Sequence, residues 1–306
     1  MNKLLSLVFA AFFAACLSVA LTTGASAQKS FKSAQEAADA LVAAARTGDQ
    51  KAIVSVLGSG GADIASSGDP VADEQGRKTF VTAYDTKHSI DAKGDRAVLV
   101  IGAQDWPFPI PIVQKDGNWR FDTAAGREEI LARRIGRNEL STIQAVLAYI
   151  DAQDEYAEMS RKTAGSAIYA QRIVSNPGKK DGLYWPSAQG EPESPLGDTI
   201  AAATSQGYKF GGGRAPYHGY YYKILTRQGP TATGGALDYV VRGKMIGGHA
   251  LVAYPAQYGN SGITTFLVNH EGTVFEKDLG PKTAQIVRKM RSFSPDKTWK
   301  KVEAGK

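Results

Sequence analysis

The chain has 306 residues, of which 36 are Lys or Arg and 30 are Asp or Glu, so its net charge near pH 7 is +6. This positive charge is mild and evenly spread, without the basic arm or block that is typical of nucleic-acid binding. A chain of this length can enclose one large core or two ordinary ones. The composition therefore predicts globular domains and no nucleic-acid partner.

The N-terminal residues 1–27 are typical of a secretory signal peptide. Lys3 precedes an apolar stretch from Leu4 to Leu21, and the small-residue site Ala25-Ser26-Ala27 follows it. The apolar stretch is short for a membrane span, which needs about 20 residues, and no basic stop-transfer cluster follows. We expect cleavage before Gln28, a periplasmic location and no membrane span in the mature chain.

The single cysteine of the chain, Cys16, lies inside this predicted signal. An alternative to a free periplasmic protein is a lipoprotein anchored at Cys16, because Phe13-Ala14-Ala15-Cys16 loosely resembles a lipobox. Cleavage before Gln28 would remove the cysteine, and the mature chain would then have no disulfide and no thiolate chemistry.

Two helices are predicted directly after the signal. Ser33 and Glu36 have the spacing of a capping box, a stripe of small apolar residues follows, and Gly48 ends the first helix. Asp49 is a suitable N-cap for a second helix that ends at Gly58.

A sheet is predicted after the turn-rich stretch 67–70, with strands at 97–101, 106–113 and 119–121. Prolines occupy alternate positions from 107 to 111, so this segment is expected to be either an edge strand or an extended rim of the sheet. Asp116-Gly117 predicts a tight hairpin turn before the third strand.

Helices followed by such a sheet resemble the NTF2-like cone, and we assign this domain to residues 28–126. NTF2-like cones often hold an apolar cavity, which the resemblance would line with Trp106, Phe108, Trp119 and Phe121. The alternative is that these four side chains fill a solid core.

The second predicted domain spans residues 127–306, and the charged segment 122–138 is the predicted junction. A helix is expected from about Asn138 to Ser160, with an apolar stripe that includes Leu140 and Ile150. A loop-rich region with a short helix near 199–206 comes next. Antiparallel strands are expected at 219–225, 237–241, 249–254, 263–269 and 274–277.

A long helix followed by antiparallel strands resembles the head of a type IV pilin or pseudopilin. The residues that precede the helix are Arg, Glu and Asn, so the apolar half-helix that anchors pilins is missing. The predicted fold class is α+β with two domains, a cone followed by a pilin-like head.

Taken whole, residues 30–300 resemble a bacterial envelope family known as domain-of-unknown-function family 2950. The resemblance rests on five segments, which are Ser67–Pro70, Asp105–Pro109, Arg133–Leu140, Gly182–Pro186 and Asp278–Pro281. The family implies an envelope location but no catalytic residue. Where its pattern has an aromatic residue, this chain has His249.

Catalytic patterns are missing from the sequence. The histidines at 88, 218, 249 and 270 have no zinc-binding spacing, and no Gly-x-Ser-x-Gly elbow occurs. Ser294–Lys297 matches Ser-x-x-Lys by chance, and Gly211–Arg214 is predicted to be a flexible loop and not a phosphate cradle. Glu128, Glu129 and Glu139 are expected to pair with Arg133, Arg134 and Arg137 at the domain joint. The alternatives are an anion site at this cluster or a glycosidase-like pair among the carboxylates. We therefore predict no cofactor and no metal.

Aromatic residues in or beside loops are the candidate binding residues: Tyr184, Trp185, Tyr217, His218, Tyr220 and Tyr222. Such faces stack on sugars or on peptide side chains, and loops on a rigid sheet often carry binding residues. The alternative is that Tyr220 and Tyr222 face the core.

Two functional hypotheses remain. The first is a non-enzymatic scaffolding or binding protein whose partner is an envelope, pilus or secretion protein or a cell-wall glycan. The second is a small-molecule or glycan-binding protein, or a hydrolase, with its site in the N-terminal cone or at the domain joint.

Overall fold

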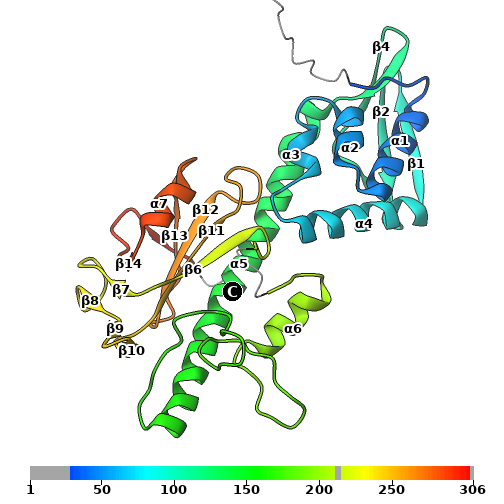
Figure 1. The fold of residues 1–306 in the computed structure, drawn as a ribbon. Coiled ribbons are helices and arrows are strands. Elements are labelled where there is room, and N and C mark those ends of the chain that lie inside the picture. Colours follow the sequence, from blue (N-terminus) through cyan, green and yellow to red (C-terminus); the bar gives the residue numbers. More distant parts are fainter. Residues whose placement is uncertain (1–27, 211–214, 304–306) are drawn as a thin grey trace, which may run out of the picture.

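The computed structural model describes residues 28–210 and 215–303 of this chain. The predicted signal peptide, Cys16 and the Gly211–Arg214 loop lie outside the described residues. The fold is mixed α+β, with N-terminal helices and a sheet, a long central helix, and a C-terminal part that is mostly antiparallel sheet (Figure 1).

The first two helices, α1 (Ala34–Thr47) and α2 (Gln50–Leu57), form as predicted from their caps. The Ser33 hydroxyl accepts a hydrogen bond from the Glu36 N–H at 3.1 Å, and Gly48 ends α1 in the left-handed region. The Asp49 carboxylate accepts from the first free N–H groups of α2. The local cap chemistry therefore defines both helices.

Two further helices, α3 (Gly61–Ala65) and α4 (Pro70–Thr86), were not predicted. The segment before α4 resembles a turn in sequence, but Asp69 is the N-cap of α4 and Pro70 its first residue. Proline is tolerated there because the first helical N–H has no intrahelical partner.

The N-terminal sheet contains β1 (His88–Lys93), β2 (Arg96–Ile101), β4 (Ile112–Lys115) and β5 (Asn118–Phe121) in that order, with β3 (Trp106–Pro107) beside β2. The single strand predicted at 106–113 was wrong, because the prolines interrupt it between β3 and β4. The β4–β5 hairpin is confirmed. Asp116 and Gly117 both have positive φ, as a two-residue type I′ turn requires.

The long helix α5 runs from Thr123 to Ala164, so the predicted start near Asn138 was wrong. Its 42 residues span about 63 Å at 1.5 Å per residue. Gly126 and Leu131 are buried in this segment, while most of its charged residues stay exposed. So few buried positions give no clear helical periodicity in the sequence. The predicted junction is therefore a continuous helix that passes from one half of the molecule to the other (Figure 1).

The main C-terminal sheet is an antiparallel meander, as predicted. Its order is β15 (Lys300–Lys301), β13 (Phe275–Asp278), β12 (Thr264–Asn269), β11 (Ala250–Pro255) and β6 (Tyr220–Leu225). One face packs on α5 through Tyr149, Leu251 and Phe266. All six residues of β11 are buried, so this strand lies at the centre of the C-terminal core.

Smaller elements surround this sheet. Helix α6 (Gly197–Ser205) is confirmed, whereas α7 (Thr283–Lys289) was not predicted. The strand predicted at 237–241 is divided into β8 (Leu237–Asp238) and β9 (Val240–Val241). Strand β8 pairs with β7 (Arg227–Gln228), which also pairs in parallel with β14 (Ser292–Phe293), while β9 pairs with β10 (Lys244–Met245). Within the described ranges no helix is long and apolar enough to cross a membrane.

Candidate functional site

A buried carboxylate connects the two halves of the molecule. Asp69 is fully buried, and its Oδ1 accepts from the Ala72 N–H at 3.1 Å as the N-cap of α4. Its Oδ2 accepts from the Tyr208 hydroxyl at 2.9 Å and from the Gly219 N–H at 2.8 Å. One N-terminal side chain therefore fixes two C-terminal segments, the chain after α6 and the turn before β6.

Side chains of α5 complete this joint. Arg134 donates to the carbonyl oxygens of Asp63 and Ile64, each at 2.7 Å. Asn138 donates to the Ser261 carbonyl at 2.8 Å. Burial lowers the pKa of Arg134. The segment 134–138 therefore holds both halves through backbone carbonyls.

The ion-pair cluster expected from the sequence is mostly not formed. Glu139 accepts from the N–H groups of Ile263 and Thr264, each at 3.0 Å, at the start of β12. Arg133 pairs with Glu129 one helical turn away at 2.5 Å. The backbone N–H groups at the start of β12 bind the Glu139 carboxylate in place of an arginine. The sequence alone does not show which of these donors Glu139 will bind.

The turn held by Asp69 carries two of the predicted aromatic residues. Tyr217 and Tyr220 exchange backbone hydrogen bonds of 2.9 and 3.1 Å around His218 and Gly219, which both have positive φ. A Cβ atom on Gly219 would lie 2.5 Å from the Asn138 amide nitrogen, so glycine is required there. Tyr217 and His218 are therefore presented from a fixed two-residue turn.

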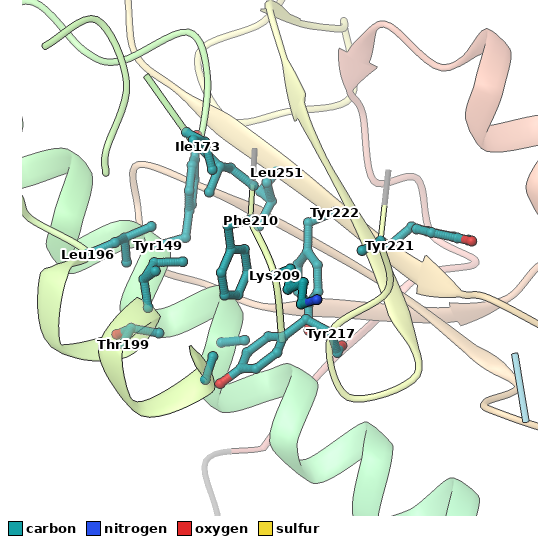
Figure 2. Close-up of a pocket in the computed structure, with 15 residues that line it drawn as sticks. Tyr149, Ile173, Leu196, Thr199, Lys209, Phe210, Tyr217, Tyr221, Tyr222 and Leu251 are labelled. Atoms are coloured by element: carbon teal, nitrogen blue, oxygen red, sulfur yellow. Dashed lines mark hydrogen bonds between the residues drawn. The ribbon is translucent and has the colours of Figure 1, made fainter. Parts of the chain in front are cut away.

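A cavity of about 220 Å³ lies beside this turn, between α5, α6 and the C-terminal sheet (Figure 2). Its walls are mostly aliphatic and aromatic. The described lining consists of Ala145, Tyr149, Ile173, Val174, Leu196, Thr199, Ile200, Ala203, Lys209, Phe210, Ala215, Tyr217, Tyr221, Tyr222 and Leu251.

Two of the six predicted binding residues, Tyr217 and Tyr222, line this cavity. The Tyr217 ring contacts Tyr208 with centroids 5.0 Å apart, and the Tyr222 hydroxyl donates to the Tyr217 carbonyl at 3.3 Å. Burial raises the pKa of both Tyr217 and Tyr222, so these phenols are neutral near pH 7. They offer aromatic surface, not a charged base.

The other four predicted binding residues lie elsewhere. The His218 ring contacts the Tyr217 ring at a tilt of 44°, with centroids 4.1 Å apart. Burial lowers the pKa of the His218 imidazole against the opposing effect of Asp69. Trp185 is buried against Tyr156, and its neighbour Tyr184 is half-buried. Tyr220 is fully buried, and its hydroxyl donates to the Thr264 carbonyl at 3.0 Å. The structure therefore does not bring the six side chains into one surface.

The four aromatics assigned to an N-terminal cavity do not share one. Phe108 packs between Phe80 and Phe121 at centroid distances of 5.3 and 6.3 Å. Trp106 lies under the Arg133 guanidinium, 5.3 Å from its ring centroid, and Trp119 is half-buried. Of the four, Phe121 alone borders a hollow of about 380 Å³, which is otherwise lined mainly by polar groups near Gln28.

The lining of the C-terminal cavity is mostly apolar and aromatic. Its described lining contains no carboxylate, histidine, serine or cysteine. Across residues 28–210 and 215–303, no group of three or more His, Cys, Asp or Glu side chains is placed to hold a metal ion. The cavity can therefore enclose an apolar group, with Lys209 as the one charged side chain in the described lining.

Sequence reasoning missed Asp69, Tyr208, Lys209 and Phe210 as parts of the site. Asp69 lies in one of the segments that carry the family resemblance, but its sequence indicates only a turn. Tyr208 bonds to it across 139 sequence positions. A contact between residues so far apart in the chain cannot be predicted from local sequence periodicity.

These features define an α+β protein whose halves share a buried polar joint and whose C-terminal half holds an apolar cavity. The chain belongs to the family described as Protein of unknown function (DUF2950), which matches residues 28–302. No curated protein matches the chain significantly, and no solved structure does.

Proposed function

We propose that this protein is an exported, non-enzymatic binding protein of the cell envelope that holds one apolar side chain of a partner protein in its C-terminal cavity. The observation that carries the proposal is the apolar cavity of about 220 Å³ beside the turn that Asp69 fixes. A signal-like N-terminus supports export.

The size of the cavity supports a single side chain as its occupant. Pockets for drug-sized ligands measure roughly 300–1,000 Å³, and a cavity of about 150 Å³ can hold benzene. A space of about 220 Å³ suits one aromatic or branched aliphatic group. Burying such a group contributes about 1.5–3 kcal/mol, as an anchor residue at an interface does.

We further propose that the C-terminal half corresponds to a pilin or pseudopilin head without its apolar stem, and the N-terminal half to an NTF2-like cone. The packing of α5 on the antiparallel meander supports the first proposal. The packing of α1 and α2 on the N-terminal antiparallel sheet supports the second. A head that lacks its stem suits a scaffolding partner of an envelope, pilus or secretion protein.

The experiment fills the cavity instead of removing a wall. Ala145 on α5 lines the cavity and is half-buried, so Ala145→Phe places a ring inside it. Ala132 lies exposed on the same helix, and Ala132→Phe is the matched control. Both variants should keep the fold, which circular dichroism and urea unfolding check.

Binding is measured with a neutral probe and in cells. Acetyl-phenylalanine amide should shift amide resonances of the cavity in wild type and Ala132→Phe, but not in Ala145→Phe. In-cell crosslinking should capture one envelope protein with wild type and Ala132→Phe, but not with Ala145→Phe. If the probe binds all three proteins equally, or binds only residues near Phe121, the cavity is not the site and the N-terminal ligand hypothesis gains support.

A further inference from the structure

The hydroxyls of Tyr149 and Tyr222, which line the cavity, already form hydrogen bonds within the protein. The Tyr149 hydroxyl donates to the Ala250 carbonyl at 3.3 Å and accepts from the Gln153 amide at 3.0 Å. The Tyr222 hydroxyl donates to the Tyr217 carbonyl at 3.3 Å. A polar group placed at this depth would lose its water and gain little in return, so the interior selects an apolar body.

The other polar groups of the lining belong to exposed or half-buried residues. Lys209 is exposed and has no ion-pair partner in the described part of the chain. The side-chain hydroxyls of Thr199 and Tyr217 likewise make no hydrogen bond to another described residue. In the view of Figure 2, Lys209 lies on the Tyr217 and Tyr222 side of the cavity.

Lys209 is positively charged, whereas the Thr199 and Tyr217 hydroxyls are neutral. An ammonium group only donates, whereas a hydroxyl can donate or accept. No carboxylate in the described lining offsets the charge of Lys209. An anion, which only accepts hydrogen bonds, therefore complements Lys209, while a cationic ligand would meet a like charge.

On the basis of the proposed binding function, we infer that the occupant is the C-terminal residue of a partner polypeptide. Its aromatic or branched side chain enters the cavity, and its α-carboxylate meets the ammonium group of Lys209. The cavity volume admits one side chain, so the anion that meets Lys209 must lie close to that side chain. In a polypeptide, only the C-terminal residue carries a carboxylate on its α-carbon. At an internal residue a neutral amide takes its place.

The test compares two peptides that differ only in this carboxylate. Acetyl-Gly-Ser-Gly-Phe is prepared with a free C-terminus and as its amide, and each is titrated into the mature protein by NMR or calorimetry. We expect the acid to bind about five-fold tighter than the amide, the ratio expected for one partly exposed charge pair. Raising the salt concentration should reduce that ratio.

Variants assign the preference to Lys209. Lys209→Gln should bring the affinity of the acid down to that of the amide and leave the amide unchanged. Lys115→Gln, which removes an exposed lysine from the distant β4–β5 hairpin, should retain the five-fold preference. Equal binding of acid and amide to wild type would overturn the inference and leave the proposed function intact.

Two further outcomes separate the alternatives. If 3-phenylpropionate binds as tightly as the peptide acid, the occupant is a small aromatic acid and not a chain terminus, which overturns the inference. If neither peptide binds, while the protein is folded, the cavity is not a binding site and the proposed function fails together with the inference.

Discussion

His249 gives the sharpest test of the energetic reasoning, because this imidazole is fully buried and neither ring nitrogen has a hydrogen-bond partner among the described residues. It is surrounded by the rings of Tyr149, Tyr169 and His270, and the nearest carboxylate oxygen, on Asp154, is 4.0 Å from Nε2. Burial, with a smaller contribution from His270, lowers the pKa of His249 to about 3.

The depressed pKa makes the folded state sensitive to acid. An unfolded histidine titrates near pH 6.5, so between pH 6.5 and about 3 the unfolded chain binds a proton that the folded chain does not. Stability from this residue is therefore fully present above pH 6.5 and is lost as the pH falls. From pH 7.5 to pH 5 the loss is about 2 kcal/mol, at about 1.36 kcal/mol per pH unit.

The variant His249→Phe removes both the titration and the unpaired nitrogens. We expect its unfolding free energy at pH 7.5 to exceed that of wild type by about 1–3 kcal/mol, because no buried polar atom is left unpaired there. The advantage should widen by about 2 kcal/mol at pH 5. Urea unfolding at a series of pH values measures both quantities, and an NMR titration checks that the folded imidazole stays neutral at pH 5. Parallel pH profiles of the two proteins would refute the reasoning.

The remaining predictions concern the joint and one close contact. Asp69→Ala should destabilise the protein by about 3–5 kcal/mol in urea unfolding, because the Tyr208 hydroxyl and the Gly219 N–H lose their acceptor; a loss under 1 kcal/mol would mean that water replaces the carboxylate. Gly262→Ala should cost about 3 kcal/mol, since its Cβ would lie 2.1 Å from the Tyr220 hydroxyl oxygen. Gly259→Ala, whose Cβ meets nothing within 4 Å but has positive φ, should cost about 1–2 kcal/mol, and equal losses would contradict the packing argument.

The elements that could be predicted are those with local causes. The caps at Ser33 and Asp49 and the turn at Asp116-Gly117 act through neighbours in sequence. Their hydrogen bonds and φ values depend on a few consecutive residues. These elements therefore form as their residues predict.

What could not be predicted depends on distant contacts. The charged segment 123–138 belongs to α5 because its side chains contact both halves: the Thr123 hydroxyl donates to the Leu57 carbonyl, and the Asn138 amide donates to the Ser261 carbonyl. The cavity arises from α5, α6 and β6 together, so aromatic enrichment indicated Tyr217 and Tyr222 but could not separate them from the buried Trp185 and Tyr220. Side-chain type shows what a residue can bind, whereas its exposure is set by the tertiary fold.

Because α5 is one continuous helix, it fixes the rotation of one half relative to the other about the helix axis. Each residue of an α-helix turns the chain by about 100°, so inserting one residue between Leu131 and Asn138 would rotate one half against the other by that angle. The same insertion would carry Asp69 away from Gly219, although neither core had lost a single side chain. The number of residues in α5 between the two halves therefore determines whether the contacts of the joint can form.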